Sequence, residues 1–210
     1  MEKKESINQK NPIIILIESG LEFWIKQQCK KIDHLSISID GKILNILRGK
    51  IDCVKVVAEK INFQDILISN ANIKTSAMKV KLGTNNSTKK IKLSEFSIQG
   101  SLILSSSDIN SIICSKSWVN INRLISNKLL DNSSIQSVNI SDNLLSIVHR
   151  GSNKSSAIKS FQVSCNSSSI ALKDPASMNN VILPMDESVK IIEANIDKTY
   201  LRISLETIIK

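Results

Sequence analysis

The chain has 210 residues and a formal net charge of +9; 41% of its residues are hydrophobic, 22% are charged and only 3% are aromatic. This composition excludes an intrinsically disordered chain and predicts a globular fold with an aliphatic core. Residues 1–100 hold 17 Lys and Arg against 10 Asp and Glu, so the excess positive charge lies mainly in the first half and favours an anionic partner.

The N-terminal region is predicted to be a short tail followed by a helix. Residues 1–11 are polar and charged, which predicts a disordered tail ahead of a single domain over 12–210. Asn11 is a favourable N-cap, and Pro12 suits the first helical position. Apolar residues then recur at helical spacing as far as about Ile32, which predicts one amphipathic helix.

The same region carries no recognisable export or spanning segment. Its apolar run, Ile13 to Ile17, is five residues long. A signal-peptide core needs about 7–15 apolar residues and a spanning helix about 20. We therefore expect a cytoplasmic protein, with peripheral association as the form of any membrane contact.

After the helix the apolar period changes to two, which predicts strands. Leu35, Ile37 and Ile39 alternate with serines, and Asp40-Gly41 forms a turn signal. Further runs predict strands as far as residue 104; these runs are Ile43–Leu47, Ile51–Val57, Ile66–Ile68, Ala71–Leu82 and Ile91–Leu104.

One part of this block, Lys74 to Lys92, holds six lysines and no carboxylate. Between Met78 and Leu82 apolar residues alternate with lysines, and Thr84–Thr88 has the composition of a hairpin tip. An acidic membrane, a nucleic acid or protection of a sheet edge would each explain the charge. The candidates for contact with an anionic surface are Lys74, Lys79, Lys81, Lys89, Lys90 and Lys92.

The residue pattern in the second half of the sequence predicts helices and then more strands. Ser107 or Asp108 would cap a helix, and a second helical period follows Trp118. Strands are predicted at Val138–Ile140, Leu144–His149, Lys159–Cys165, Ser169–Leu172, Val189–Ile196 and Tyr200–Leu205, with a loop over 173–188. Helix, strands, helices and strands in this order predict an α+β fold, in which the two strand blocks could be halves of one sheet.

The residues needed for common catalytic and metal sites are missing from the sequence pattern. Cys29, Cys53, Cys114 and Cys165 lie far apart without a zinc-binding spacing, so we expect reduced thiols and no metal or cofactor. The two histidines stand in no recognisable triad, and no phosphate-binding glycine motif is present. We therefore predict that the protein is not an enzyme.

The lysine-rich segment favours lipid over nucleic acid. It contains no aromatic residue for base stacking and no arginine for base recognition. Each lysine held near an anionic leaflet contributes about 1 kcal/mol to binding, so several could attach the protein without insertion. Protection of sheet edges and solubility remain the simplest alternative.

The order of several motifs resembles the LmeA-like family of phospholipid-binding proteins. The likeness covers roughly residues 13–130 and rests on the helix followed by LSISIDG, on Leu47-Arg48-Gly49-Lys50-Ile51 as a leucine-x-glycine-x-isoleucine element, and on Leu102–Leu104 followed by Asp108-Ile109-Asn110. The resemblance implies a fold similar to tubular lipid-binding proteins, with a long helix in a curved antiparallel sheet and an apolar groove for acyl chains. It implies phospholipid binding in membrane lipid metabolism or transfer, and it supplies no catalytic residues.

These observations lead to a prediction of a non-catalytic protein that binds phospholipid or an anionic membrane surface. The groove candidates are Leu21, Trp24, Ile37, Ile39, Val54, Val56 and Phe63, each of which would equally suit a dry core. The alternative is a protein-interaction or assembly factor whose basic surface meets an acidic protein. A third reading is an enzyme that acts on a lipid-linked substrate. Phospholipid binding differs from the protein-interaction alternative because it predicts a hydrophobic cargo.

Overall fold

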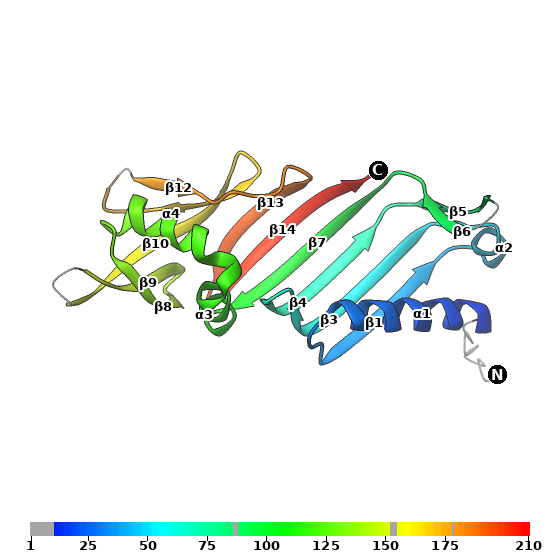
Figure 1. Ribbon diagram of the computed structural model, residues 1–210, viewed down its shortest axis with the longest axis horizontal. Helices are drawn as coiled ribbons and strands as arrows, with labels where there is room; N and C mark the ends of the chain where they lie inside the picture. Colours follow the sequence, from blue (N-terminus) through cyan, green and yellow to red (C-terminus); the bar gives the residue numbers. More distant parts are fainter. Residues whose placement is uncertain (1–10, 86–87, 152–154, 178) are drawn as a thin grey trace, which may run out of the picture.

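The computed structural model describes residues 11–85, 88–151, 155–177 and 179–210, with the backbone alone for residues 81–85, 88–92 and 114. It is an α+β fold dominated by antiparallel strands, as predicted (Figure 1). Its helices are α1 (Pro12–Gln28), α2 (Ile43–Leu47), α3 (Ser106–Cys114) and α4 (Val119–Leu129), with a 3₁₀ turn at Lys116–Trp118. The predicted tail lies outside the described residues except for Asn11.

The strands form three antiparallel sheets. The largest has the order β1 (His34–Asp40), β3 (Cys53–Phe63), β4 (Ile66–Thr75), β7 (Phe96–Ser105), β14 (Tyr200–Ile209) and β13 (Val189–Asp197). The second has the order β12 (Asn180–Ile182), β11 (Ser169–Lys173), β10 (Ser156–Asn166), β9 (Leu144–Arg150) and β8 (Ser134–Ser141). The third is a small sheet of β2 (Lys50–Ile51), β5 (Met78–Asn85) and β6 (Thr88–Leu93).

The N-terminal helix begins as predicted and ends earlier. The Ile13 amide donates to Asn11 Oδ1 at 3.0 Å, and Pro12 occupies the first turn. The helix ends at Gln28 rather than near Ile32 because the next backbone groups pair with the end of β3. The Lys30 amide donates to the Asn62 carbonyl, and the Asn62 amide donates to the Lys31 carbonyl, both at 2.8 Å.

Two predictions for the first strand block are wrong. The segment Ile43–Leu47 is helix α2, in which Ile46 is buried while Leu44 and Leu47 are exposed. Five residues are too few for periodicity to distinguish a helix from a strand. The predicted strands Ala71–Leu82 and Ile91–Leu104 are each divided in two, by turns that separate β4 from β5 and β6 from β7.

Helix α3 is capped by Ser105, so the predicted caps Ser107 and Asp108 are wrong. Asp108 is instead the third residue of a capping box, in which the Asp108 amide donates to Ser105 Oγ and the Ser105 amide donates to Asp108 Oδ2. Asn110 binds the edge of β8: its Oδ1 accepts from the Val138 amide at 2.6 Å, and its Nδ2 donates to the Val138 carbonyl at 2.5 Å. This arrangement gives structural roles to the Asp-Ile-Asn element.

The two strand blocks meet in the six-stranded sheet. β14 pairs with β7 from Tyr200–Ser105 to Ile209–Phe96, so the C-terminal strand lies beside a strand of the first half. The loop predicted over 173–188 also contains a short strand, β12, which pairs with β11. This strand was missed because it has only three residues and lies among loop-type residues.

A partly buried ion pair joins β10 to the loop after β11. Lys159 Nζ lies 2.9 Å from Asp174 Oδ2 and donates to the Leu129 carbonyl at the end of α4. The side chain of Asp174 is 4% exposed and also accepts from the Ala176 amide and the Ser177 hydroxyl. The hydrogen bond from Lys159, followed by those from Ala176 and Ser177, lowers the pKa of Asp174 to about 2.

We expect this carboxylate to make folding sensitive to acid. Because its folded pKa lies below the unfolded value of about 3.9, its ionised form stabilises the fold above about pH 4, and this stability is lost as pH falls toward 2. Asp174→Asn should therefore unfold at a lower temperature near pH 6 and show a smaller further loss near pH 2.5 than the wild type. Circular dichroism melts at both values provide the measurement.

Glu187→Gln, at an exposed position in the following loop, is the control and should keep the acid response of the wild type. An Asp174→Asn variant whose melting temperature falls as much as that of the wild type would contradict the assignment.

Candidate lipid-binding face

The inner face of the six-stranded sheet is built of apolar rows that run across the strands. In the strand order given above, one row is Leu35, Ala58, Ala71, Leu102, Ile203 and Ala194, and the next is Ile37, Val56, Ile73, Gly100, Leu205 and Ile191. Residues directly opposite one another share a face, so the register places all of these positions on one side.

Two hydrophobic clusters cover the ends of this face. One packs Ile14, Ile17, Leu21 and Ile25 of α1 against β1, β3 and β4. The other packs α3 and α4 against β7, β13, β14 and the five-stranded sheet. Leu102 contacts both clusters. Between α1 at one end and α3 and α4 at the other, Figure 1 shows long stretches of β7 and β14 that no helix covers.

A central strip of four residues, Ile73, Ile98, Gly100 and Leu205, occupies this uncovered part of the inner face. Gly100 lies opposite both Ile73 and Leu205, and Ile98 lies one step along β7 on the same face. All four are half-buried, and Ile73 and Ile98 belong to neither hydrophobic cluster. The strip is therefore apolar surface that the fold leaves partly open.

The structure brings together five of the seven groove candidates. Leu21, Ile37, Ile39, Val54 and Val56 lie in the cluster under α1, where Ile37, Ile39 and Val54 are buried. In the described structure these five contribute to the contact between helix and sheet, in which Leu21 and Val56 are half-buried. Their role in holding a lipid stays a prediction.

The other two groove candidates lie elsewhere. Trp24 is 61% exposed on the outward side of α1, and Phe63 is exposed at the end of β3. Both rings lie outside the cluster formed by the other candidates.

The predicted lysine cluster is divided between two sheets. Lys74 lies on β4 in the large sheet, and Lys79 lies on β5 in the small sheet; both are exposed. The other candidates, Lys81, Lys89, Lys90 and Lys92, lie on β5 and β6, and their side chains are outside the described residues. The register places Lys81 opposite Lys92. Their role at an anionic surface stays a prediction.

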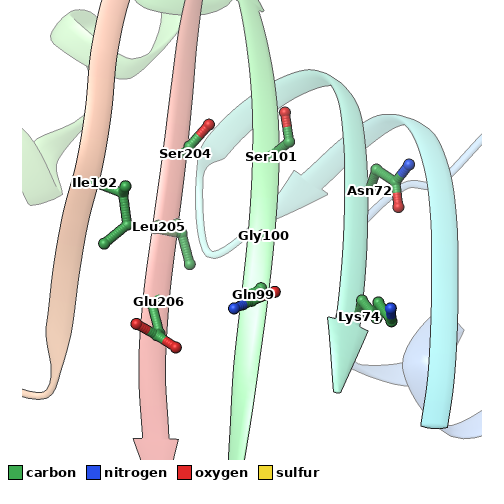
Figure 2. Close-up of a pocket in the computed structure, with 9 residues that line it drawn as sticks. All are labelled: Asn72, Lys74, Gln99, Gly100, Ser101, Ile192, Ser204, Leu205 and Glu206. Carbon is green, nitrogen blue, oxygen red and sulfur yellow. The ribbon is translucent and has the colours of Figure 1, made fainter. Parts of the chain in front are cut away.

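The opposite face of the same strands carries a hollow of about 440 Å³ (Figure 2). Most of its lining surface is apolar, although six of its nine lining residues carry polar or charged side chains; the lining comprises Asn72, Lys74, Gln99, Gly100, Ser101, Ile192, Ser204, Leu205 and Glu206. Gln99 lies between Lys74 and Glu206 in one cross-strand row. An acyl chain in the hollow would have to desolvate these polar and charged side chains, whereas the inner strip has none, so the strip is the better candidate for acyl chains.

Sequence reasoning missed the central strip and the exposed leucines of α2. Ile73 and Ile98 were recognised as strand residues, but nothing in a strand pattern shows whether a helix covers them. The sequence analysis assigned these two residues to no face of a sheet, and it could not supply the β4–β7–β14 pairing that places them together.

The described residues form no group of three His, Cys, Asp or Glu side chains that could hold a metal ion. None of the helices in the described ranges combines the length and apolarity needed to cross a membrane.

Comparison with known proteins gives one match. A family model described as LmeA-like phospholipid-binding matches residues 11–164, which extends the region of likeness beyond residue 130 and through most of β10. No curated protein and no solved structure matches the chain.

Proposed function

Because the chain belongs to the LmeA-like phospholipid-binding family, we propose that it holds the acyl chains of a phospholipid along the central strip. The observation that carries this proposal is the position of Ile73 and Ile98, which are apolar, half-buried and part of neither cluster. Covering them with an acyl chain would remove apolar surface from water without displacing either core.

The size of the inner face supports the proposal. Neighbouring strands lie about 4.8 Å apart, so β4, β7 and β14 together present a band wide enough for one or two acyl chains. Along β7 the inner positions from Phe96 to Leu102 extend about 20 Å, which is comparable to the length of a fatty acyl chain. Gly100 in the middle of this track presents no side chain to obstruct a ligand.

We further propose that the protein binds phospholipid without catalysis and acts in membrane lipid metabolism or transfer. The central strip contains no titratable side chain. His34 lies on the edge strand β1 and His149 on β9 in a different sheet, so the two are not neighbours within one site. A general acid or base would have to reach the strip from elsewhere.

One observation favours a second function, a protein-interaction surface on α1. Leu16, Phe23 and Trp24 are exposed on this helix, and exposed aromatic residues are common anchors of protein interfaces. A protein partner there would bind on the side of the helix that does not contact the sheet.

The proposal is tested by native mass spectrometry of gently purified protein, followed by solvent extraction of any bound molecule. We expect phospholipid at one fixed stoichiometry, because a strip of defined length accepts a defined number of chains. Protein that remains free of lipid after incubation with mixed phospholipids would refute cargo binding. In that case the α1 surface would become the leading candidate for function.

A further inference from the structure

We propose that α2 and the basic residues around it form the surface through which this protein docks on an anionic phospholipid membrane. The surface, here called the α2 tip, consists of Lys42, Leu44, Leu47, Arg48, Lys50 and Lys79. This surface would contact a membrane, which is separate from the proposed binding of a phospholipid as cargo. The proposal rests on that function only because it takes phospholipid as the binding partner.

Helix α2 presents apolar side chains on two sides. Ile46 is buried in the cluster under α1, which anchors the helix to the fold. Leu44 and Leu47 are three residues apart, share a face and are 65% and 58% exposed. More than half of each leucine side chain lies outside the fold, so the two suit contact with an external apolar phase.

The residues beside these leucines are cationic. Lys42 precedes the helix, and Arg48 and Lys50 follow it; all three are exposed. Lys79 lies directly opposite Lys50 in the β2–β5 pair. Like charges directly opposite each other in antiparallel strands are destabilising, so this pair needs an external anion or solvent to compensate for its repulsion.

The four cations lack the partners that neutralise other lysines. In the described part of the chain, none of Lys42, Arg48, Lys50 and Lys79 forms a salt bridge. Asp52 lines a hollow of about 310 Å³ with Lys50 and Lys79, and Asp40, two residues before Lys42, is paired with Lys55 at 2.7 Å. The α2 tip therefore keeps a positive charge that complements anionic headgroups.

The exposed apolar side chains of α1 differ from those of α2 in the charged residues around them. Leu16 is 73% exposed, more than either leucine of α2. The cations near that helix are paired, however, since Lys26 lies 2.6 Å from Glu22 and Lys30 lies 2.5 Å from Asp65. Exposed apolar side chains therefore occur at both places, but among the cations of the described residues 11–85, unpaired ones accompany the leucines of α2 while Lys26 and Lys30 beside α1 are paired.

The geometry also fixes the α2 tip to the small sheet. The Val80 amide donates to the Gly49 carbonyl at 2.7 Å, so the turn after α2 lies against β5 immediately beside Lys79. Figure 1 shows α2 with β5 and β6 at one end of the molecule, away from α3 and α4. A protein that docks through this end would leave the central strip accessible beyond it.

The test measures binding of the purified 210-residue protein to vesicles of phosphatidylcholine, alone or mixed with phosphatidylglycerol. We expect binding to the mixed vesicles that weakens steeply between about 0.1 M and 0.5 M salt. Leu44→Gln with Leu47→Gln should weaken this binding at least about tenfold, because both apolar side chains are lost. Lys50→Gln with Lys79→Gln should weaken it by roughly 30-fold and flatten its salt dependence.

Leu16→Gln is the matched control, since it removes a leucine that is more exposed than those of α2 and whose described neighbouring cations, Lys26 and Lys30, are paired. It should bind the mixed vesicles as the wild type does. Unchanged binding by either α2-tip variant, or a loss of binding in Leu16→Gln alone, would overturn the proposal. Circular dichroism establishes that each variant is folded, and the lysine variant tests the surface without changing the helix.

Native mass spectra of the same variants separate this proposal from the cargo function. A leucine variant that carries phospholipid but no longer binds vesicles supports docking through α2 independently of the strip. A second outcome is a wild type that carries no phospholipid and still binds mixed vesicles through α2. That result would refute the proposed cargo function and leave the docking proposal standing.

Discussion

Replacing Ile73 and Ile98 with asparagine is expected to remove phospholipid from the purified protein while the fold is retained. Both side chains are half-buried on the inner face and lie outside the two clusters, so the native core loses little. An acyl chain on the strip would, by contrast, have to desolvate two amides, each at a cost of about 1–3 kcal/mol. Together these costs correspond to at least about 30-fold weaker retention.

The measurement is phospholipid occupancy by native mass spectrometry, with a thermal melt to establish folding. Ile192→Asn is the matched control: Ile192 is an exposed isoleucine of the same sheet that lines the hollow on the opposite face. It should retain phospholipid as the wild type does. Full occupancy in the Ile73→Asn, Ile98→Asn double variant would show that acyl chains lie elsewhere.

Adding a methyl group at Gly49 is expected to destabilise the protein by about 2–4 kcal/mol. Gly49 has φ +73°, a left-handed conformation that side chains with a Cβ rarely adopt, and a Cβ there would lie 2.1 Å from the Val80 carbonyl oxygen. The backbone of β5 is held in its sheet and cannot move aside without breaking the hydrogen bond between Val80 and Gly49. Chemical denaturation of Gly49→Ala measures the effect.

Gly20→Ala makes the same chemical change, but we expect it to increase the free energy of unfolding rather than decrease it. Gly20 lies within α1, and apart from its chain neighbours and the adjacent helix backbone no described atom lies within 4 Å of the position its Cβ would take. Alanine there should stabilise the protein by about 0.5–1 kcal/mol, because it restricts the unfolded chain and favours the helix. A Gly49→Ala variant as stable as the wild type would show that the turn after α2 is not held closely against β5.

Local sequence patterns were sufficient for the elements whose signals are long or chemically specific. The α1 helix was predicted from Asn11-Pro12 and a long helical period, and β1 from strict alternation between Leu35 and Ile39. The α+β class and the family resemblance followed from the order of such elements, and both are confirmed. These features depend on neighbours in the chain, which a sequence displays directly.

Short elements could not be predicted in the same way. Ile43–Leu47 was expected to be a strand because five apolar and polar residues fit either period, and its helical form depends on Ile46 packing into the cluster under α1. Asn110 was recognised only as part of a motif. Its hydrogen bonds to Val138 join residues 28 positions apart, and no local pattern specifies them.

The sequence by itself therefore determined that this chain folds as an aliphatic, basic α+β protein of a phospholipid-binding family. Only the tertiary structure decided where apolar surface remains uncovered. The central strip exists because β14 pairs with β7 while the helices pack at the two ends of the sheet, and the α2 tip exists because Ile46 turns inward and leaves Leu44 and Leu47 outside. Exposure depends on which distant segments meet, and residues 100 positions apart in the chain meet only after the sheet has formed.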